Sequence, residues 1–370
     1  MKILSLSTLP LLPHLGSGKT RIRWTEGLRE LGHEVEVLQP ADFELWPNQI
    51  RAKKYRQAVG VFLKVRQLLK IKEYDLIEFY GDEYWLLLLW LTRKKKRPLL
   101  VAHVDGIELH DMDKEQRFWH PRVGFKKWLF TNTHYRFSKI TFSLADRYVC
   151  GCQDDLEYVV QQRLFSREHA ECISPALDEL FHQIAFQQSK EKIILFLGSW
   201  IDRKGIRIIP EVLSKILYKY PDYQFHVYGA WYAKDYIEQL FANDLTDRIR
   251  VFDKLPQVEL LEGIKKSAIF FFPSYSEGFG LATAEAMSCG CAVVTTKTGL
   301  GSNLEIDKEA LICEFDNVEQ MEEAIAKLIL NEELRSKIAL SGYNKVRGFI
   351  WQNQIQKLEK TYSNWLNSCK

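Results

Sequence analysis

The sequence lacks any apolar stretch that could cross a bilayer. Its most apolar run, Trp85 to Leu91, is far shorter than the roughly 20 residues that a transmembrane helix requires. The first residues are apolar, but Pro10 and Pro13 interrupt them and no small-residue cleavage site follows, so we expect no signal peptide. With neither kind of segment, the sequence predicts a cytoplasmic protein.

The sequence also lacks the paired cysteines of a disulfide framework or a zinc site. It has seven cysteines, an odd number, and no Cys-x-x-Cys motif, so we expect reduced, buried thiols. Cys289 and Cys291 flank Gly290, but two thiols do not make a metal site, and we interpret Gly290 as the C-cap of a helix. The net charge is only +3, which gives no indication of nucleic acid binding, and no motif indicates a metal or another cofactor.

What the sequence does contain is a regular alternation of strand and helix patterns in two blocks. In the first block we predict strands over residues 2–7, 34–38, 74–79, 98–103 and 147–151, with helices over 20–31, 58–69 and 84–91. In the second block we predict strands over 192–197, 223–228, 268–272 and 292–295, with helices over 206–219, 319–330 and 332–346. This alternation predicts an α/β protein of two Rossmann-like domains with parallel sheets, residues 1–180 and 190–348, joined by a polar linker.

A glycine-rich segment after the first strand looks like the end of a phosphate-binding P-loop. It reads Gly16-Ser17-Gly18-Lys19-Thr20, but a P-loop needs a glycine five residues before the Gly-Lys pair. Pro13 occupies that position and has no N–H to offer a phosphate, so we disfavour an ATP site. Gly16 and Gly18 would still let a ligand approach the backbone in a turn after the strand.

The segment at residues 273–290 carries the clearest chemical pattern. A turn with Glu277, Gly278 and Gly280 follows a buried strand and precedes a helix that contains Glu285. Glycines remove side chains where a ligand must touch the backbone, and the N–H groups at a helix start can bind a phosphate. Glu285 could accept hydrogen bonds from sugar hydroxyls, while Glu277 lies at the sheet edge where open α/β folds bind ligands. The plainer alternative is that Glu277 caps a helix and the glycines shape a turn.

The two glutamates are separated by seven residues within Glu-Gly-Phe-Gly-Leu…Glu-Ala-Met…Gly-Cys-Ala-Val-Val, and this string resembles the signature of retaining GT-B glycosyltransferases of family 4. The resemblance implies two Rossmann-like domains facing a central cleft, retention of the anomeric configuration and independence from metal. It also implies that Glu277 contacts the donor sugar and Glu285 the nucleotide ribose, with Phe279, Gly280 and Leu281 in the same donor-binding turn.

Other segments fit the same template. Gly32-His33-Glu34-Val35 resembles the family's Gly-His-x-Val after the first helix. The resemblance places Gly16 and Gly18 where the donor phosphates approach, and we expect contacts to the base near Gly229. It also implies that a last helix, residues 350–370, completes the acceptor domain 1–180, while residues 190–348 form the donor domain.

One stretch departs from the family. Relatives usually have Gly-Arg, four residues, and Lys-Gly after the first strand of the second domain, and both cations neutralise the diphosphate leaving group. This sequence reads Gly198-Ser199-Trp200-Ile201-Asp202-Arg203-Lys204-Gly205, so Lys204 matches the lysine while Ser199 replaces the arginine. Arg203 either supplies the missing charge in the donor site or faces solvent.

A second departure lies at the end of the predicted strand 98–103. Many relatives have His-Gly where this sequence has Asp105-Gly106, and His103 lies two residues earlier. In a strand His103 and Asp105 would share a face, so either could approach the sugar. We therefore name Asp105 and His103 as catalytic candidates beside Glu277 and Lys204, with a structural histidine as the alternative for His103.

Two segments of the first domain, residues 85–97 and 117–130, combine aromatic side chains with positive charge. Such surfaces suit anionic lipid headgroups, with aromatic rings at the interface. We therefore expect peripheral contact with an anionic membrane, at the inner face of the cytoplasmic membrane, and a glycan or lipid-linked acceptor. The alternative is a buried helix with a solvated basic end and an ordinary loop.

These observations predict a retaining, metal-independent hexosyltransferase that uses a nucleotide diphosphate sugar and no other cofactor, in bacterial cell-envelope polysaccharide synthesis. Two alternatives remain open. One is another GT-B enzyme of sugar nucleotides, such as an epimerase or a glucan synthase. The other is a non-catalytic scaffold that keeps the fold, which only the loss of arginine at Ser199 favours.

Overall fold

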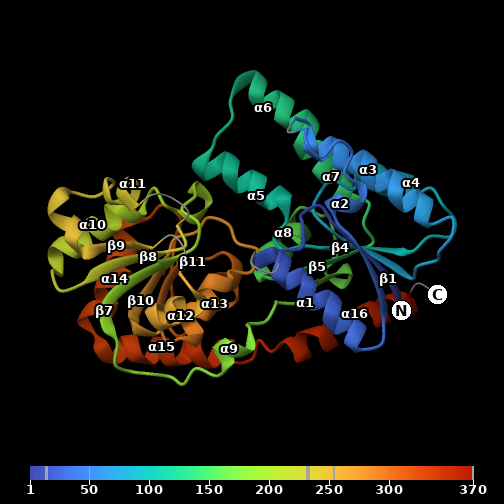
Figure 1. Cartoon of the computed structure of the whole chain (residues 1–370). Helices are drawn as coiled ribbons and strands as arrows, with labels where there is room; N and C mark the ends of the chain where they lie inside the picture. The colour runs from blue at the N-terminus through green and yellow to red at the C-terminus, as the bar shows by residue number, and fades with distance from the viewer. Residues whose placement is uncertain (13–15, 50, 231–233, 253–254, 369–370) are drawn as a thin grey trace. The chain divides into compact units, whose positions relative to one another are not determined.

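The computed structural model describes residues 1–12, 16–49, 51–230, 234–252 and 255–368 (Figure 1). Pro13, which interrupts the P-loop pattern, lies outside these residues. The chain forms two compact units: unit 1 is Met1–Pro175 with Trp351–Lys370, and unit 2 is Ala176–Ile350. Each unit is built on one parallel sheet, as the predicted α/β class with two Rossmann-like domains requires.

Unit 1 has a six-stranded parallel sheet in the order β2-β1-β3-β4-β5-β6. Its strands are β1 (Lys2–Ser7), β2 (Glu34–Leu38), β3 (Leu76–Tyr80), β4 (Leu99–His103), β5 (Arg147–Cys150) and β6 (Ala170–Cys172). β3 and β4 are buried along their whole length, as expected for central strands of a parallel sheet with both faces covered. The strand order reverses between β1 and β3, and open α/β sheets bind ligands at the carboxyl ends of such a switch point.

Helices cover the sheet of unit 1, and the end of the chain returns to it. The helices are α1 (Gly16–Glu30), α2 (Pro40–Phe43), α3 (Lys53–Leu68), α4 (Trp85–Leu91), α5 (Glu108–Lys114), α6 (Gly124–Phe130), α7 (Arg136–Ser143), α8 (Gln153–Gln161) and α16 (Trp351–Ser368), with short helical turns η1 (Glu115–Trp119), η2 (Thr131–Tyr135) and η3 (Arg167–His169). α16 lies along α1, where Trp24 and Trp351 meet edge to face with ring centroids 5.0 Å apart. Gly27 of α1 leaves room for the Ile355 side chain of α16, since a Cβ there would collide with it.

Unit 2 repeats this plan with the strand order β12-β11-β10-β7-β8-β9. Its strands are β7 (Glu191–Leu197), β8 (Gln224–Tyr228), β9 (Ile249–Phe252), β10 (Ser267–Phe272), β11 (Ala292–Thr296) and β12 (Leu311–Cys313). Its helices are α9 (Glu179–His182), α10 (Ile209–Lys219), α11 (Lys234–Glu238), α12 (Gln257–Lys266), α13 (Leu281–Ser288), α14 (Val318–Leu330) and α15 (Glu332–Val346), with short turns η4 (Asp202–Lys204), η5 (Asn243–Arg248) and η6 (Gly299–Asn303). Here the order reverses between β7 and β10, which makes their carboxyl ends the switch point.

The structure differs from the sequence prediction at the sheet edges, at helix starts and in several helices that were not predicted, among them α5, α8 and α12. The helix predicted over 58–69 begins five residues earlier, at Lys53. The unpredicted strands β6, β9 and β12 have three or four residues each and all lie at a sheet edge, where the apolar pattern is weakest. The helix predicted from residue 20 begins at Gly16, so Gly16 and Gly18 lie in its first turn and not in a loop. A Cβ on Gly18 would collide with the backbone of Leu12, so close packing of the chain itself requires this glycine.

Two smaller expectations are also met in the described residues. Six cysteines fall within them, all as thiols and five of them buried. Gly290 has φ +77° and donates its N–H to Met287 at 2.9 Å, while the Cys291 N–H reaches Ala286 at 3.0 Å, so Gly290 ends α13 as predicted. No described helix combines the length and the apolar character needed to span a membrane.

Candidate active site

An ion pair between Lys204 and Glu277 lies at the switch point of unit 2. Lys204 is in the turn η4 that follows β7, and Glu277 is in the loop that follows β10, so the two adjacent strands deliver them to the same sheet edge. The Lys204 ammonium donates directly to Oε1 of Glu277, and the two side chains are 14% and 10% exposed. The Ser274 hydroxyl donates to the same carboxylate oxygen at 2.6 Å.

The electrostatics keep Glu277 charged. Burial alone would raise the pKa of its carboxyl, but the charge of Lys204, then that of Arg203, and the hydrogen bonds from Lys204 and Ser274 lower that pKa below its usual value. The Lys204 ammonium also lies 5.0 Å from the centroid of the Phe272 ring. The site therefore offers a carboxylate and an ammonium together, with a second cation close enough to act on the carboxylate.

Backbone contacts fix the loop that carries Lys204. The Tyr275 N–H donates to the Arg203 carbonyl at 2.9 Å, which ties η4 to the loop after β10. Gly205 has φ +74°, and a Cβ there would collide with the Pro273 carbonyl, so only glycine fits between the two loops. In the Lys-Gly pair noted in the sequence, Gly205 is thus required for this close approach.

The turn before α13 is shaped in a similar way. Gly280 has φ +86° and stands directly before the first residue of α13. The Glu277 N–H donates to the Thr298 hydroxyl at 3.1 Å, and a Cβ on Gly299 would lie 2.5 Å from the Cβ of Glu277. Glu277 is therefore held from two sides, by the loop after β11 and by the loop after β7.

The remaining predicted donor residues of this turn divide into two groups. Phe279 is only 6% exposed and meets Phe349 edge to face at 5.4 Å, while Leu281 packs against the core of unit 2. Their side chains support the turn, so any donor contact from them would come from the backbone. Gly278 is half-buried beside Glu277. Glu285 is half-buried one turn into α13, the helix that begins directly after this loop.

Glycines end the two neighbouring strands of unit 2. Gly198 follows β7 with φ +137° and Gly229 follows β8 with φ +74°. A Cβ on either would meet nothing closer than 3.9 Å, so packing does not demand these glycines, although their positive φ does. Ser199, at the position of the missing arginine, is half-buried next to Gly198.

The switch point of unit 1 holds a second ion pair. Arg21 of α1 donates from Nε to Asp105 at 2.7 Å and from Nη1 to the Ser7 hydroxyl at the end of β1 at 2.7 Å. The Asp105 side chain is 22% exposed, against 8% for Arg21. Although burial lowers the pKa of Arg21, the interaction with Asp105 raises it overall, so this guanidinium is charged. Asp105 is therefore presented at the sheet edge by a buried arginine.

His103 lies in a different environment from Asp105. Its side chain is 3% exposed, and Nδ1 lies 2.9 Å from the Tyr80 hydroxyl, 3.1 Å from the Tyr362 hydroxyl and 3.5 Å from Glu78. The Tyr362 hydroxyl in turn donates to Glu78 at 2.7 Å. This buried network joins β3, β4 and α16, and it favours the structural alternative for His103 over contact with a sugar.

Three carboxylates near the switch point of unit 1 were missed in the sequence. Asp82 and Glu83 follow β3 and lie 2.8 and 3.8 Å from the Lys54 ammonium. Burial, then Asp82, raises the pKa of Glu108 well above its usual value, and one oxygen of Glu108 is buried without a hydrogen bond. Asp82 and Glu83 follow β3 and Glu108 follows β4, so only the strand order, which places the ends of these two strands side by side, could have identified this cluster.

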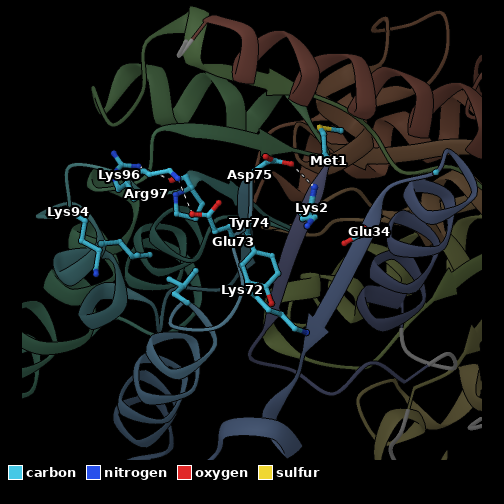
Figure 2. Close-up of a pocket in the computed structure, with 14 residues that line it drawn as sticks. Met1, Lys2, Glu34, Lys72, Glu73, Tyr74, Asp75, Lys94, Lys96 and Arg97 are labelled. Atoms are coloured by element: carbon cyan, nitrogen blue, oxygen red, sulfur yellow. Dashed lines mark hydrogen bonds and ion pairs between the residues drawn. The ribbon is translucent and has the colours of Figure 1, made fainter.

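A large pocket lies elsewhere. A cavity of about 720 Å³ lies at the amino ends of the strands of unit 1. Met1, Lys2, Glu34 and Asp75 are among the residues that line it (Figure 2). It contains none of the predicted site residues, and it lies at the sheet edge opposite to Asp105. Among the residues that the structure describes, no group of three or more His, Cys, Asp or Glu side chains is arranged to hold a metal ion.

Two family models match the chain and together span most of it. The model described as Glycosyl transferases group 1 matches residues 178–345, and the one described as Glycosyltransferase Family 4 matches residues 16–179. The first therefore covers most of unit 2 and the second most of unit 1 outside α16.

Individual relatives are more distant. D-inositol 3-phosphate glycosyltransferase of Corynebacterium jeikeium is 29% identical over 183 residues, which are 47% of this chain and 43% of that protein. One component of the phosphatidylinositol N-acetylglucosaminyltransferase of Homo sapiens is 26% identical over 229 residues, which are 60% of this chain and 47% of that protein. In these matches the chain spans about half the length of the curated relatives.

Solved structures match the whole fold. Sucrose-phosphate synthase of Thermosynechococcus elongatus has a TM-score of 0.77 at 16% identity and covers 100% of both chains. HepE of Anabaena, solved with UDP-glucose, has a TM-score of 0.69 at 16% identity and covers 98% of this chain and 100% of its own. At this identity the likeness concerns the fold, which is the two-domain GT-B architecture.

Proposed function

The chain belongs to the group 1 glycosyltransferases of family 4, and from this premise we propose that it moves a sugar from a nucleotide diphosphate sugar to a hydroxyl of a glycan or lipid-linked acceptor. The observation that carries the proposal is the ion pair of Lys204 with Glu277 at the switch point of unit 2. An α/β fold binds its ligands there, and a sugar diphosphate needs both a hydrogen-bond acceptor and a cation.

Each side chain of this site has a distinct role in the proposal. The Glu277 carboxylate accepts hydrogen bonds from the donor sugar, and Lys204 stabilises the charge that develops on the diphosphate as the glycosidic C–O bond breaks. Arg203 adds to that field, and the N–H groups at the start of α13 contact a phosphate. Glu285, one turn into α13, binds the ribose hydroxyls, in the way that an acidic residue does in dinucleotide folds.

The acceptor side of the proposal lies in unit 1. Asp105, oriented by Arg21 at 2.7 Å, is a partly exposed carboxylate just beyond the end of β4 and is proposed to bind the acceptor hydroxyl or the sugar. His103 is proposed to hold this region in shape through Tyr362 and Glu78 without touching the substrate. The reaction is proposed to retain the anomeric configuration, through an oxocarbenium-like state, and to need no metal.

The comparisons support the substrate classes of this proposal. HepE was solved with UDP-glucose, which favours a nucleotide sugar as donor, and two relatives are named for an inositol phosphate and for phosphatidylinositol. A phosphorylated or lipid-linked polyol is therefore the acceptor class to try first. The setting we propose is envelope polysaccharide synthesis at the inner face of a bacterial membrane, with peripheral membrane contact.

The experiment is a turnover assay of the full chain with UDP-glucose, UDP-N-acetylglucosamine and GDP-mannose. The acceptors are D-inositol 3-phosphate, phosphatidylinositol vesicles and water, the last giving slow hydrolysis. We expect release of one nucleoside diphosphate, unchanged by EDTA, and a first product with the donor's own anomeric configuration by NMR. Glu277→Gln should abolish release, whereas Glu262→Gln, a half-exposed carboxylate paired with Lys265 on α12, should not. Absence of release with every donor would contradict the proposal and favour a scaffold.

A further inference from the structure

The structure separates the two aromatic and basic segments that the sequence suggested for membrane contact. In the first, Trp85 stacks on Phe137 at 4.5 Å and Trp90 meets Phe62 edge to face at 5.8 Å, so both rings are engaged within unit 1. Two cations of that segment are paired as well, Lys96 with Glu73 and Arg97 with Asp146. The segment at residues 85–97 therefore offers no aromatic surface for a partner.

The second segment comprises the end of η1, where Phe118 and Trp119 are half-buried, and helix α6, which is almost entirely solvent-exposed. No residue of α6 is buried, and four large apolar side chains in or beside it face solvent: Val123 (75% exposed), Phe125 (73%), Trp128 (59%) and Leu129 (47%). We call these four side chains the α6 patch. Phe125, Trp128 and Leu129 have the i, i+3, i+4 spacing of one helix face, and the Phe125 and Trp128 rings stack at 5.6 Å. A contiguous aromatic face of this kind is uncommon on a monomer unless it binds something.

The fold carries the α6 patch away from the body of unit 1. α6, η2 and α7 follow one another without a break from Gly124 to Ser143, and the residues that anchor this rod are at its far end: Ser138, Thr141 and Phe142 are buried. At about 1.5 Å per residue, Phe125 lies roughly 20 Å along the rod from Ser138. Figure 1 shows α6 projecting beyond α3 and α7, on the side away from the strands of unit 1.

The charge around the α6 patch has one sign. Residues 116–145 contain six Lys or Arg and no Asp or Glu. Lys126 and Lys127, which stand between Phe125 and Trp128 in the sequence, are exposed, while Arg122 is held by Glu115 at 2.9 Å and lies over the Phe130 ring at 4.0 Å. The apolar face is thus surrounded by cations that no acid of the same segment neutralises.

We propose that the α6 patch is a membrane-docking element that inserts Phe125, Trp128 and Leu129 into the interface of an anionic bilayer. Interfacial helices combine an aromatic and leucine face with flanking lysines in this way. A protein partner would have to desolvate Lys126 and Lys127, and lysine is depleted from protein interfaces. A second copy of this chain would bring two such cationic segments together. An anionic lipid surface accepts the aromatic rings at its interface and attracts the lysines through its headgroup charge.

The docking element deepens the acceptor side of the proposed function, on which its biological purpose rests, because it would hold unit 1 at the surface where a lipid-linked acceptor lies. Its test does not need turnover. Flotation of the full chain without donor, on vesicles of phosphatidylcholine alone or with about 30% phosphatidylglycerol, measures docking by itself. If the chain transfers sugar but does not dock, only the membrane proposal is overturned. If it docks but does not transfer sugar, only the proposed function is overturned.

We expect the wild type to float with the anionic vesicles and to remain unbound with pure phosphatidylcholine. Reversal of two charges in Lys126→Glu/Lys127→Glu should reduce the bound-to-free ratio at least about tenfold. Phe125→Ser/Trp128→Ser should reduce it similarly, because the apolar contribution is lost. All of these side chains are exposed, so the melting temperature should not change, which a parallel melt checks.

Two control pairs match these changes outside the α6 patch. Lys94→Glu/Lys95→Glu makes the same charge change in the other basic segment, and Trp46→Ser/Ile71→Ser removes two exposed apolar side chains of unit 1, which are 69% and 75% exposed. Both pairs should bind as the wild type does. The proposal would be overturned if either control pair lost as much vesicle binding as the α6 variants, or if the wild type did not bind anionic vesicles. It would also be overturned if the chain formed a concentration-dependent dimer that Trp128→Ser abolished.

Discussion

Units 1 and 2 share one architecture but use the polar residues at their switch points differently. In unit 2 the ion pair of Lys204 with Glu277 sits at the sheet edge, and both members come from loops that follow adjacent strands. In unit 1 the corresponding residue types are divided between a partly exposed pair, Arg21 with Asp105, and a buried network around His103. The comparison teaches that the residue type and its place at a strand end do not settle whether a side chain is available to a substrate. What settles it is which partners the side chain contacts in the fold.

The largest effect is expected from breaking the ion pair of unit 2. Lys204→Met alone leaves Glu277 buried without its partner and should destabilise the fold by about 3 kcal/mol. Glu277→Gln should lower turnover about 10²-fold or more, because the donor contact and the tuned charge are both lost. Denaturant unfolding and donor turnover measure the two effects separately.

The double variant Lys204→Met/Glu277→Gln serves as its control. Removing both charges should recover much of the stability lost in Lys204→Met, since no buried charge is left unpaired. Turnover should stay low. Recovered activity in the double variant would mean that the pair is a structural element of unit 2 and not its catalytic centre.

The next effect should sharpen the contrast between His103 and Asp105. His103→Ala removes a buried ring that contacts Tyr80, Tyr362 and Glu78, so we expect a loss of about 3 kcal/mol of unfolding free energy with kcat little changed. Asp105→Asn should differ in lowering kcat/KM at least about tenfold, and it should also cost about 2 kcal/mol of stability because the Arg21 guanidinium, 8% exposed, loses its charged partner. Urea unfolding and steady-state kinetics on both variants measure the two effects. A large loss of kcat in His103→Ala with unchanged kinetics in Asp105→Asn would contradict this assignment.

A smaller effect is expected from restoring the arginine that this chain lacks. Ser199 is half-buried two residues after the end of β7, in the segment that leads to Lys204. Ser199→Arg adds a cation next to the proposed diphosphate site, and a charge-assisted hydrogen bond there should tighten nucleoside diphosphate binding about tenfold. Isothermal titration measures this, with Ser199→Gln as the uncharged control. Equal tightening in both variants would mean that charge is not the missing component.

The smallest effect concerns the buried carboxylates of unit 1. Because burial and the charge of Asp82 raise the pKa of Glu108 well above its ordinary 4.5, the folded chain holds that proton more tightly than the unfolded chain. Stability from this group is therefore complete below about pH 4.5 and is lost as pH rises through the folded pKa. Glu108→Gln should melt at the wild-type temperature at pH 4.5 and about 3 °C higher at pH 8. A constant difference across this range would contradict the shift.

Much of the fold could be predicted because central strands and long helices leave strong patterns. β1, β2 and β7 were located within one residue, and α14 and α15 almost completely. The edge strands β6, β9 and β12 could not be found, since three or four residues are too few to show a period. The start of α1 was misplaced because Gly16 and Gly18 suggest a loop, whereas contact with Leu12 is what requires Gly18.

The candidate site was predictable only where its residues are close in sequence. Glu277, its glycines and α13 form one continuous segment, so their relation is visible in the string itself. The environment of His103 depends on Tyr362, which is 259 residues away, and no spacing rule reports that contact. Asp82, Glu83 and Glu108 likewise come together only when the strand order brings β3 beside β4.

The central claim is that unit 2 holds a nucleotide diphosphate through Glu285 and the loop of Glu277. Its most direct test is thermal stabilisation of the full chain by a panel of UDP, GDP, ADP and their sugars, for wild type, Glu285→Ala and the control Glu262→Ala. Ligand binding to the folded state raises the melting temperature by mass action. We predict a rise with one nucleotide, retained in Glu262→Ala and lost in Glu285→Ala. No rise with any nucleotide, or an equal rise in Glu285→Ala, would contradict the account.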